Sequence, residues 1–146
     1  MRARYRAWRF VLPQLLLKDE THPWRSAGLQ VTPTGRIDMV EEDESVRQAI
    51  LMLIETVPGE RVMRPDYGCN LDRLMFAPND ETTAGLAIHY VRIALDRWEP
   101  RIDIVGLDAQ RDPQRPGELD ILLDYRVRAS RRVEQLRLPI DLAGGA

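Results

Sequence analysis

The most informative stretch of the chain covers residues 56–69, which read Thr56-Val57-Pro58-Gly59-Glu60-Arg61-Val62-Met63-Arg64-Pro65-Asp66-Tyr67-Gly68-Cys69. Glycine allows the positive backbone dihedral that a tight turn after a helix requires. We therefore predict a structural turn at Pro58, Gly59, Glu60 and Arg61, locked by an ion pair between Glu60 and Arg61. Gly68 belongs to a second, packed loop.

Before this turn, apolar residues recur at helical spacing. The sequence predicts a first helix that begins at an S-x-x-Q capping box, formed by Ser45 and Gln48, and stops at Pro58-Gly59. The acidic run at residues 41–44 lies at the predicted N-terminal end, where negative charge complements the helix dipole. The predicted apolar face consists of Val46, Ala49, Ile50, Leu53, Ile54 and Val57.

After the turn, we predict an extended segment at residues 61–63, a loop at 65–70 and one packed helical turn at 71–76. A second helix then opens with Asn79 or Asp80 as its cap. Its apolar positions run at helical spacing to Trp98, and Pro100 stops it, because proline disfavours helical geometry at the preceding residue.

The last third of the sequence changes its apolar period from 3.6 to 2, which indicates strands. The first predicted strand begins at Ile102 and Ile104, with a bulge near Gly106. A loop at residues 112–117 separates it from a second strand, in which Leu119, Ile121, Leu123, Tyr125 and Val127 alternate with polar residues. A third strand carries Leu136, Leu138 and Ile140. The predicted fold is α+β: two main helices followed by a C-terminal antiparallel three-stranded β-meander, with an N-terminal arm.

The sequence predicts an N-terminal arm, residues 1–30, and one domain, residues 31–146, which opens with a short extended lead-in that has apolar residues at Ile37 and Met39. Pro13, Pro23 and Gly28 break any long element in the arm, whose apolar residues need a surface to order against. Its own domain and a partner subunit remain equal alternatives for that surface. We interpret the basic and apolar start as an arm and not as an export signal, because Lys18-Asp19-Glu20 replaces the small residues of a cleavage site.

Composition argues against several classes of function. A net charge of −2 gives no overall field for nucleic acid, and no apolar run is long enough for a membrane span, so neither nucleic-acid binding nor membrane insertion is expected. The single cysteine, Cys69, and two isolated histidines offer no metal ligand spacing, so no metal and no cofactor is expected.

The segment from residue 56 to 69, together with the complete Glu99-Pro100-Arg101 triplet, resembles the contractile-tail baseplate wedge and sheath-initiator family. This family includes phage GpW-like wedge proteins and their relatives in type VI secretion and extracellular injection systems. The resemblance covers about residues 37–138. This chain has Tyr67 where the family often has phenylalanine.

The resemblance implies a structural particle component, made in the cytoplasm and present in about six copies in the baseplate. Its implied partners are other wedge subunits and the first sheath ring, with the tail tube or hub as further candidates. The family's role for the triplet places wedge contacts at Glu99, Pro100 and Arg101. Pro139 marks the third strand as an edge strand, so Leu136, Leu138 and Ile140 are the residues expected to offer a β-edge to the sheath.

Two alternatives stay open at this point. A monomeric protein-binding regulator of similar fold would share most of these features. A lysozyme-like glycosidase would need two carboxylates in a cleft, one of them in apolar surroundings. Glu55, Glu60, Glu99 and Asp103 are candidates only because they are acidic, and Glu60 and Glu99 each have an arginine nearby. We predict no catalytic residues and no enzyme activity.

Overall fold

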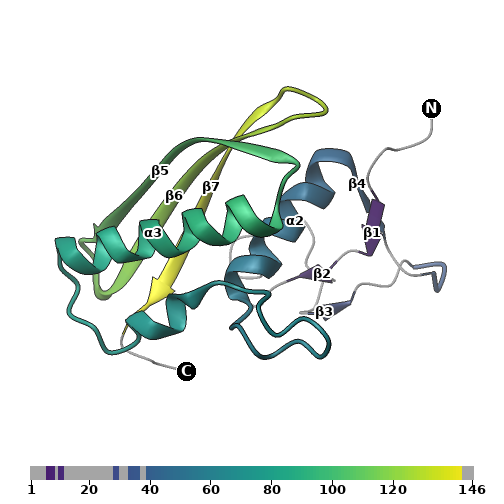
Figure 1. The fold of residues 1–146 in the computed structure, drawn as a ribbon. Helices are drawn as coiled ribbons and strands as arrows, with labels where there is room; N and C mark the ends of the chain where they lie inside the picture. The colour runs from purple at the N-terminus through teal and green to yellow at the C-terminus, as the bar shows by residue number, and fades with distance from the viewer. Residues whose placement is uncertain (1–5, 9, 12–27, 30–32, 37–38, 143–146) are drawn as a thin grey trace. The chain divides into compact units, whose positions relative to one another are not determined.

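Three long antiparallel strands form the C-terminal part of the protein. In the computed structural model, β5 (Ile102–Asp112), β6 (Arg115–Val127) and β7 (Val133–Asp141) lie side by side in the order β5-β6-β7 (Figure 1). The five alternating apolar residues of β6 are fully buried: Leu119, Ile121, Leu123, Tyr125 and Val127. Each residue of this kind stabilises the fold by about 1.5–3 kcal/mol when it leaves water. The predicted fold class is confirmed.

The structure describes residues 6–8, 10–11, 28–29, 33–36 and 39–142. The chain divides into two compact units, residues 1–49 and 50–146. The boundary falls inside the first described helix, α2 (Glu42–Glu55), so it differs from the predicted division at residue 30, which stays a prediction. No helix in the described part of the chain combines the length and apolar character that crossing a bilayer demands.

The second helix is confirmed. α3 (Glu81–Trp98) begins at the N-cap Asp80, whose carboxylate accepts a hydrogen bond of 2.9 Å from the Thr83 N–H, and ends before Pro100. Asn79 does not cap it. Its side-chain amide donates to the carbonyl oxygens of Pro116 and Glu118, at 2.9 and 3.0 Å, and so joins the start of α3 to the start of β6.

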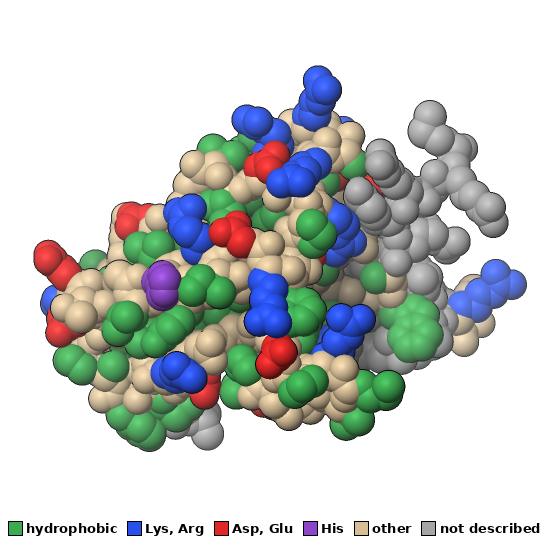
Figure 2. Space-filling view, viewed as in Figure 1, with side chains coloured by type: hydrophobic (Ala, Val, Ile, Leu, Met, Phe, Trp, Pro, Cys, Tyr) green, Lys and Arg blue, Asp and Glu red, His purple; other side chains and the backbone are tan. Residues whose placement is uncertain are grey.

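α3 crosses one face of the sheet (Figure 1) and buries Ala87, Val91, Ala94 and Leu95. A 3-10 helix, η1 (Asn70–Leu74), precedes it, which confirms the predicted packed turn and buries Leu71 and Leu74. Figure 2 shows that hydrophobic side chains also lie on the exposed side of α3 and below this helix in the view.

The predicted start of the first helix is wrong. α2 begins at Glu42, directly after the strand β4 (Met39–Glu41), so Ser45 is buried within the helix and cannot be its cap. Gln48 donates from its side chain to the Trp8 carbonyl oxygen at 2.6 Å. The acidic residues Glu42, Asp43 and Glu44 occupy the first turn, where the helix dipole favours them.

The hairpins differ in detail from the predicted loops. The register shifts between Ile104 and Gly106, which confirms the bulge in β5. Only Pro113 and Gln114 separate β5 from β6, so the predicted loop at residues 112–117 is too long. The segment at residues 61–63 is not extended, because it belongs to a bend and a hydrogen-bonded turn.

The N-terminal unit contains short strands. β1 (Arg6–Trp8) pairs antiparallel with β4, and β2 (Phe10–Val11) pairs antiparallel with β3 (Gly28–Leu29). Met39 lies in β4, as the predicted extended lead-in requires, whereas Ile37 lies outside the described residues. The proline breaks that define the predicted arm, Pro13 and Pro23, also lie outside them.

Candidate functional site

The signature stretch folds into three successive turns. Backbone hydrogen bonds join the N–H of Glu60 to the oxygen of Val57 at 3.1 Å, Arg64 to Arg61 at 3.3 Å, and Tyr67 to Arg64 at 3.1 Å. In the first turn, Pro58 and Gly59 occupy the central positions and Gly59 has a φ of +99°, which is the geometry of a type II turn. The Glu60 carboxylate accepts from the Val57 N–H at 3.2 Å.

Gly68 holds the two ends of this stretch together. Its φ is +137°, and a Cβ at this position would lie 2.5 Å from the Thr56 oxygen and 2.9 Å from the Pro58 nitrogen. The next residue, Cys69, donates its N–H to the same Thr56 oxygen at 2.9 Å. Burial raises the pKa of the Cys69 thiol to about 11, so this cysteine packs as an apolar residue and not as a nucleophile.

Aromatic stacking connects the stretch to the end of α3. The Arg61 guanidinium lies over the Tyr67 ring at 4.2 Å, and Tyr67 meets Trp98 edge-on with ring centroids 5.3 Å apart. Burial, the largest cause, raises the pKa of the Tyr67 phenol above its ordinary value. Arg61 therefore stacks on Tyr67, where the sequence predicted an ion pair with Glu60.

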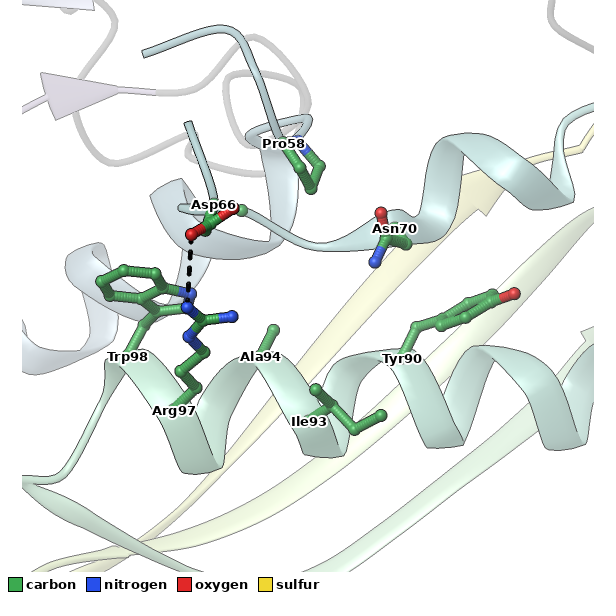
Figure 3. A pocket seen from close by; sticks show the side chains of 9 residues that line it. Pro58, Asp66, Asn70, Tyr90, Ile93, Ala94, Arg97 and Trp98 are labelled. Atoms are coloured by element: carbon green, nitrogen blue, oxygen red, sulfur yellow. Dashed lines mark hydrogen bonds and ion pairs between the residues drawn. The ribbon is translucent and has the colours of Figure 1, made fainter. Parts of the chain in front are cut away.

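A pocket of about 220 Å³ opens between this stretch and α3 (Figure 3). Tyr90, Ile93 and Ala94 line it from α3, and Asp66 and Arg97 form an ion pair of 3.4 Å beside Trp98. The remaining lining residues are Pro58, Gly68 and Asn70. The pocket could not be found from the sequence, because its walls come from residues 58–70 and from α3, which are separated along the chain and meet only in the fold.

The predicted partner-binding triplet forms a fixed corner between α3 and β5. Arg101 donates from Nε and from a terminal nitrogen to the two oxygens of Glu99, at 2.6 and 2.8 Å. The Glu99 side chain is only 4% exposed and that of Arg101 is 29% exposed, so Glu99 is placed to hold Arg101 while part of the Arg101 side chain stays accessible. The Glu99 N–H completes the helix by donating to the Leu95 oxygen at 2.9 Å.

A polar cavity of about 270 Å³ lies beside this corner. Asp96, Glu99 and Arg128 contribute its charged groups, and Leu95, Pro100, Ile102 and Ile104 complete its wall. Arg128 binds Asp103 across the β5–β6 pair, with nitrogen to oxygen distances of 2.8 and 2.9 Å. This pair was missed from the sequence, although the strand alternation places both residues on the wet face, because pairing them requires the register.

The last strand offers its backbone, and not its apolar side chains, to the outside. Leu136 and Leu138 are 1% and 4% exposed, and Ile140 is half-buried. The Leu142 N–H donates to Gly117 at 2.9 Å, and the Val127 N–H donates to Arg132 at 3.0 Å. Antiparallel strands alternate the direction of their backbone groups, so even-numbered residues of β7 bond to β6 and odd-numbered ones point away. No other described strand pairs with that outer side.

Three of the four acidic residues considered for catalysis make bonds that hold the fold. Glu60 closes a turn, Glu99 holds Arg101 and Asp103 holds Arg128, while Glu55 lies exposed at the end of α2. Within the described residues, no group of three or more His, Cys, Asp or Glu side chains is placed to hold a metal ion.

Comparison with known proteins gives one consistent family. The family model of the baseplate wedge protein gp25 matches residues 40–132. The baseplate wedge protein gp25 of Enterobacteria phage T4 is 30% identical over 64 residues, which cover 44% of this chain and 48% of that protein. The chain therefore matches about half the length of this curated relative.

Solved structures share the fold. A candidate tail lysozyme from Geobacter sulfurreducens aligns with a TM-score of 0.65 and 36% identity, over 71% of this chain and 94% of that one. A chain of the anti-feeding prophage baseplate aligns with a TM-score of 0.64 and 23% identity, over 68% of this chain and 80% of that one. The second likeness concerns the fold alone.

The family match begins in β4, includes both helices and the signature stretch, and ends in the β6–β7 turn. It thus covers well over half of the chain. The chain belongs to the gp25 baseplate wedge family.

Proposed function

We propose that this protein is a non-enzymatic baseplate component that joins wedge subunits and starts sheath assembly through the free edge of β7. The observation that carries the proposal is the outward backbone of that strand. Val133, Gln135 and Arg137 are odd-numbered, so their N–H and C=O groups point away from β6. An extended segment of a first-ring sheath subunit could pair there by β-augmentation.

The two edges of the sheet are unequal. β5 carries a bulge at Val105, and a bulge twists an edge away from regular pairing. β7 has no register shift along its pairing with β6. Pro139, also odd-numbered, lacks an outward N–H, so it limits the regular donor ladder to residues 133–137. A short, unbulged edge of this kind suits one added strand of defined register.

The corner at Glu99, Pro100 and Arg101 is the proposed contact with wedge subunits. A buried carboxylate fixes the Arg101 side chain, and a fixed guanidinium loses little conformational entropy when it binds a partner's carboxylate or carbonyl groups. In this proposal Glu99 holds the Arg101 side chain in position, and Arg101 contacts the wedge subunit. When the corner binds the baseplate, the position of β7 is fixed before any sheath subunit arrives. This removes part of the entropy cost of ordering the first sheath ring.

Loss and restoration of the gene test the proposal, with particles viewed by negative-stain electron microscopy. We expect sheathed particles to disappear in the deletion strain and to return on complementation. Normal particles in the deletion strain would remove the proposal and favour a protein-binding regulator of the same fold. An activity assay on peptidoglycan addresses the glycosidase alternative, and we expect no release of sugar fragments.

A proline at position 135 tests the β7 edge. Gln135→Pro removes one outward N–H without breaking a β6–β7 hydrogen bond, and the native Pro139 shows that an outward position accepts proline. We expect baseplates that contain the variant but lack sheath. Gln135→Ala is the matched control, since it removes the side chain and keeps the donor. A sheath of normal length on Gln135→Pro particles, with a normal circular dichroism spectrum, would disprove the edge mechanism.

A further inference from the structure

The turn at residues 61–64 places two neighbouring apolar side chains in solvent. Val62 is 90% exposed and Met63 is 91% exposed, the highest values among the large hydrophobic residues whose exposure is described. Single exposed apolar residues are ordinary on protein surfaces. Two adjacent ones at the tip of a tight turn, with almost no contact to their own chain, require a separate explanation.

The backbone at Met63 adds strain to this exposure. The Arg64 N–H donates to the Arg61 oxygen, and Met63, the third residue of the turn, has a φ of +66° while Val62 has no positive φ. This is the pattern of a type II turn, in which the third position strongly favours glycine. A methionine there carries a steric cost that a glycine would avoid. Fold stability alone therefore favours a different residue at this position.

The turn is also held rigidly. Its first residue, Arg61, stacks on Tyr67, and Tyr67 packs against Trp98 of α3. Its last residue, Arg64, accepts the Tyr67 N–H and so starts the next turn. An apolar tip on a rigid base loses little conformational freedom when it binds, which is how preorganised anchors gain affinity.

The stretch that carries this turn also lines a pocket, with Pro58, Asp66 and Gly68 on one side and α3 on the other. Its volume of about 220 Å³ lies below the usual ~300–1,000 Å³ of small-molecule sites. Ile93 and Trp98 give it an apolar lining, and Figure 3 shows the side chains of α3 facing the signature stretch across it. These dimensions fit one bulky apolar side chain of a partner protein better than a free ligand.

Arginines outnumber acidic residues on the turn, its flanks and the pocket. Arg61, Arg64 and Arg97 are exposed, and Arg97 has one carboxylate partner, Asp66, that is itself exposed and 3.4 Å away. Glu60, which directly precedes the turn, accepts a hydrogen bond from the Val57 N–H. Figure 2 shows blue side chains beside the green ones over this part of the surface. Carboxylates on a partner would complement this arrangement.

We propose that the turn at residues 61–64 and the pocket that the same stretch forms with α3 together make a docking surface for a segment of a different baseplate subunit. The segment carries a bulky apolar side chain that enters the pocket, with carboxylates on both sides that meet the arginines. Val62 and Met63 pack on the apolar part of the same segment. This inference rests on the proposed baseplate function, but it uses neither the Glu99 corner nor the β7 edge.

A photo-crosslinking amino acid, p-benzoylphenylalanine, placed at position 62 in the full chain tests the proposal in assembled particles. Mass spectrometry of irradiated particles identifies the partner peptide. We expect a crosslink to another baseplate subunit, at a segment with an apolar residue flanked by Asp or Glu. The same amino acid at Val105, an exposed apolar position on β5, is the matched control and should not crosslink to that segment.

Met63→Gly provides the second measurement. It relieves the strained backbone and deletes the anchor, so we expect an unchanged or raised Tm together with about a tenfold drop in chain recovered per particle, the size of effect expected for an interface anchor. Unchanged recovery would overturn the docking role. So would a position-62 crosslink confined to this chain or to a second copy of it.

Failure of this inference can be told apart from failure of the proposed function. A chain absent from purified particles would contradict the baseplate function itself. A chain that is present, and that crosslinks to sheath from position 133 on β7 but to no other subunit from position 62, would leave the baseplate function standing and disprove only the docking surface.

Discussion

At the scale of single residues, two glycines of the signature stretch differ in the space around them. Gly68→Ala should reduce the free energy of unfolding by about 2–4 kcal/mol, because the new Cβ would lie 2.5 Å from a backbone oxygen that cannot move away. Gly59→Ala, at a φ of +99° with open space around it, should cost only ~1 kcal/mol of backbone strain. Urea unfolding followed by circular dichroism measures both.

The difference between the two losses of unfolding free energy tests whether the close contact at Gly68 contributes to stability. Both glycines have positive φ, so equal losses would mean that backbone strain alone matters. The close approach of residues 56–58 to Gly68 would then contribute nothing to stability. A larger loss at Gly68 supports that contact as the closure of the signature stretch.

The cap of α3 predicts a pH dependence. The hydrogen bond from the Thr83 N–H lowers the pKa of Asp80 below its ordinary value of 3.8. A depressed folded-state pKa adds stability that is fully present above 3.8 and is lost as pH falls through the folded value. The Tm gap between the native protein and Asp80→Ala should therefore be widest near neutral pH and should narrow as the pH falls from 3.8 through the lowered folded-state pKa.

Asp80→Ser is the matched control for this experiment, because serine keeps an uncharged cap. Its Tm should fall less than that of Asp80→Ala, with a difference between the two variants that acid does not remove. A gap between native protein and Asp80→Ala that stays constant down to pH 2 would contradict the role of the ionised carboxylate.

Local chemistry decides which of these residues could be predicted from the sequence. Pro58-Gly59 and Asp80 act on their immediate neighbours, so turn and cap preferences were enough to find them. The need for glycine at position 68 comes from residues 56–58, which are ten to twelve positions earlier. The stacking of Arg61 on Tyr67 depends on how the turns pack. The strain at Met63 was invisible, because the sequence placed that residue in an extended segment.

At the scale of secondary structure, the junction of α3 with β5 contains the ion pair between Glu99 and Arg101. Arg101→Ala should cost more than Glu99→Ala, about 3 against about 2 kcal/mol, because it leaves the more deeply buried charge unpaired. The double variant should cost less than the sum of the two. Unfolding free energies of the four proteins form a double-mutant cycle that gives the coupling.

Additive losses in this cycle would mean that the two side chains act independently, and the fixed presentation of Arg101 would lose its basis. A strong coupling alone does not establish partner binding. It supports only the premise that Glu99 holds Arg101 in place, which the proposed wedge contact requires.

Regular elements were predicted well where a single period ran through them. α3 and β6 keep one apolar pattern over their whole length, and both were found. α2 starts three residues earlier than its apparent capping box, because β4 leads directly into it and the acidic run forms its first turn. Pro116 and Gly117 suggested a loop, but they lie within β6, where the Asn79 amide binds the Pro116 oxygen.

At the scale of the whole molecule, the sheet has a covered face and one regular open edge. The covered face gives the stability of the fold, whereas an open edge is a site of unwanted pairing. The formal net charge of −2 provides little repulsion between copies. An isolated protein of this design should therefore associate through β7 when no baseplate or sheath partner is present.

Analytical ultracentrifugation of the purified full chain measures that association. We expect a monomer to dimer equilibrium that shifts with protein concentration, in which two β7 strands pair through the outward groups of residues 133–137. Gln135→Pro should weaken the dimer and Gln135→Ala should not, because only the first removes a backbone donor. Equal dimerisation of both variants would place the contact elsewhere. A β7-dependent dimer would show that the edge accepts a strand before any sheath subunit is supplied, which is the property that a nucleating surface needs.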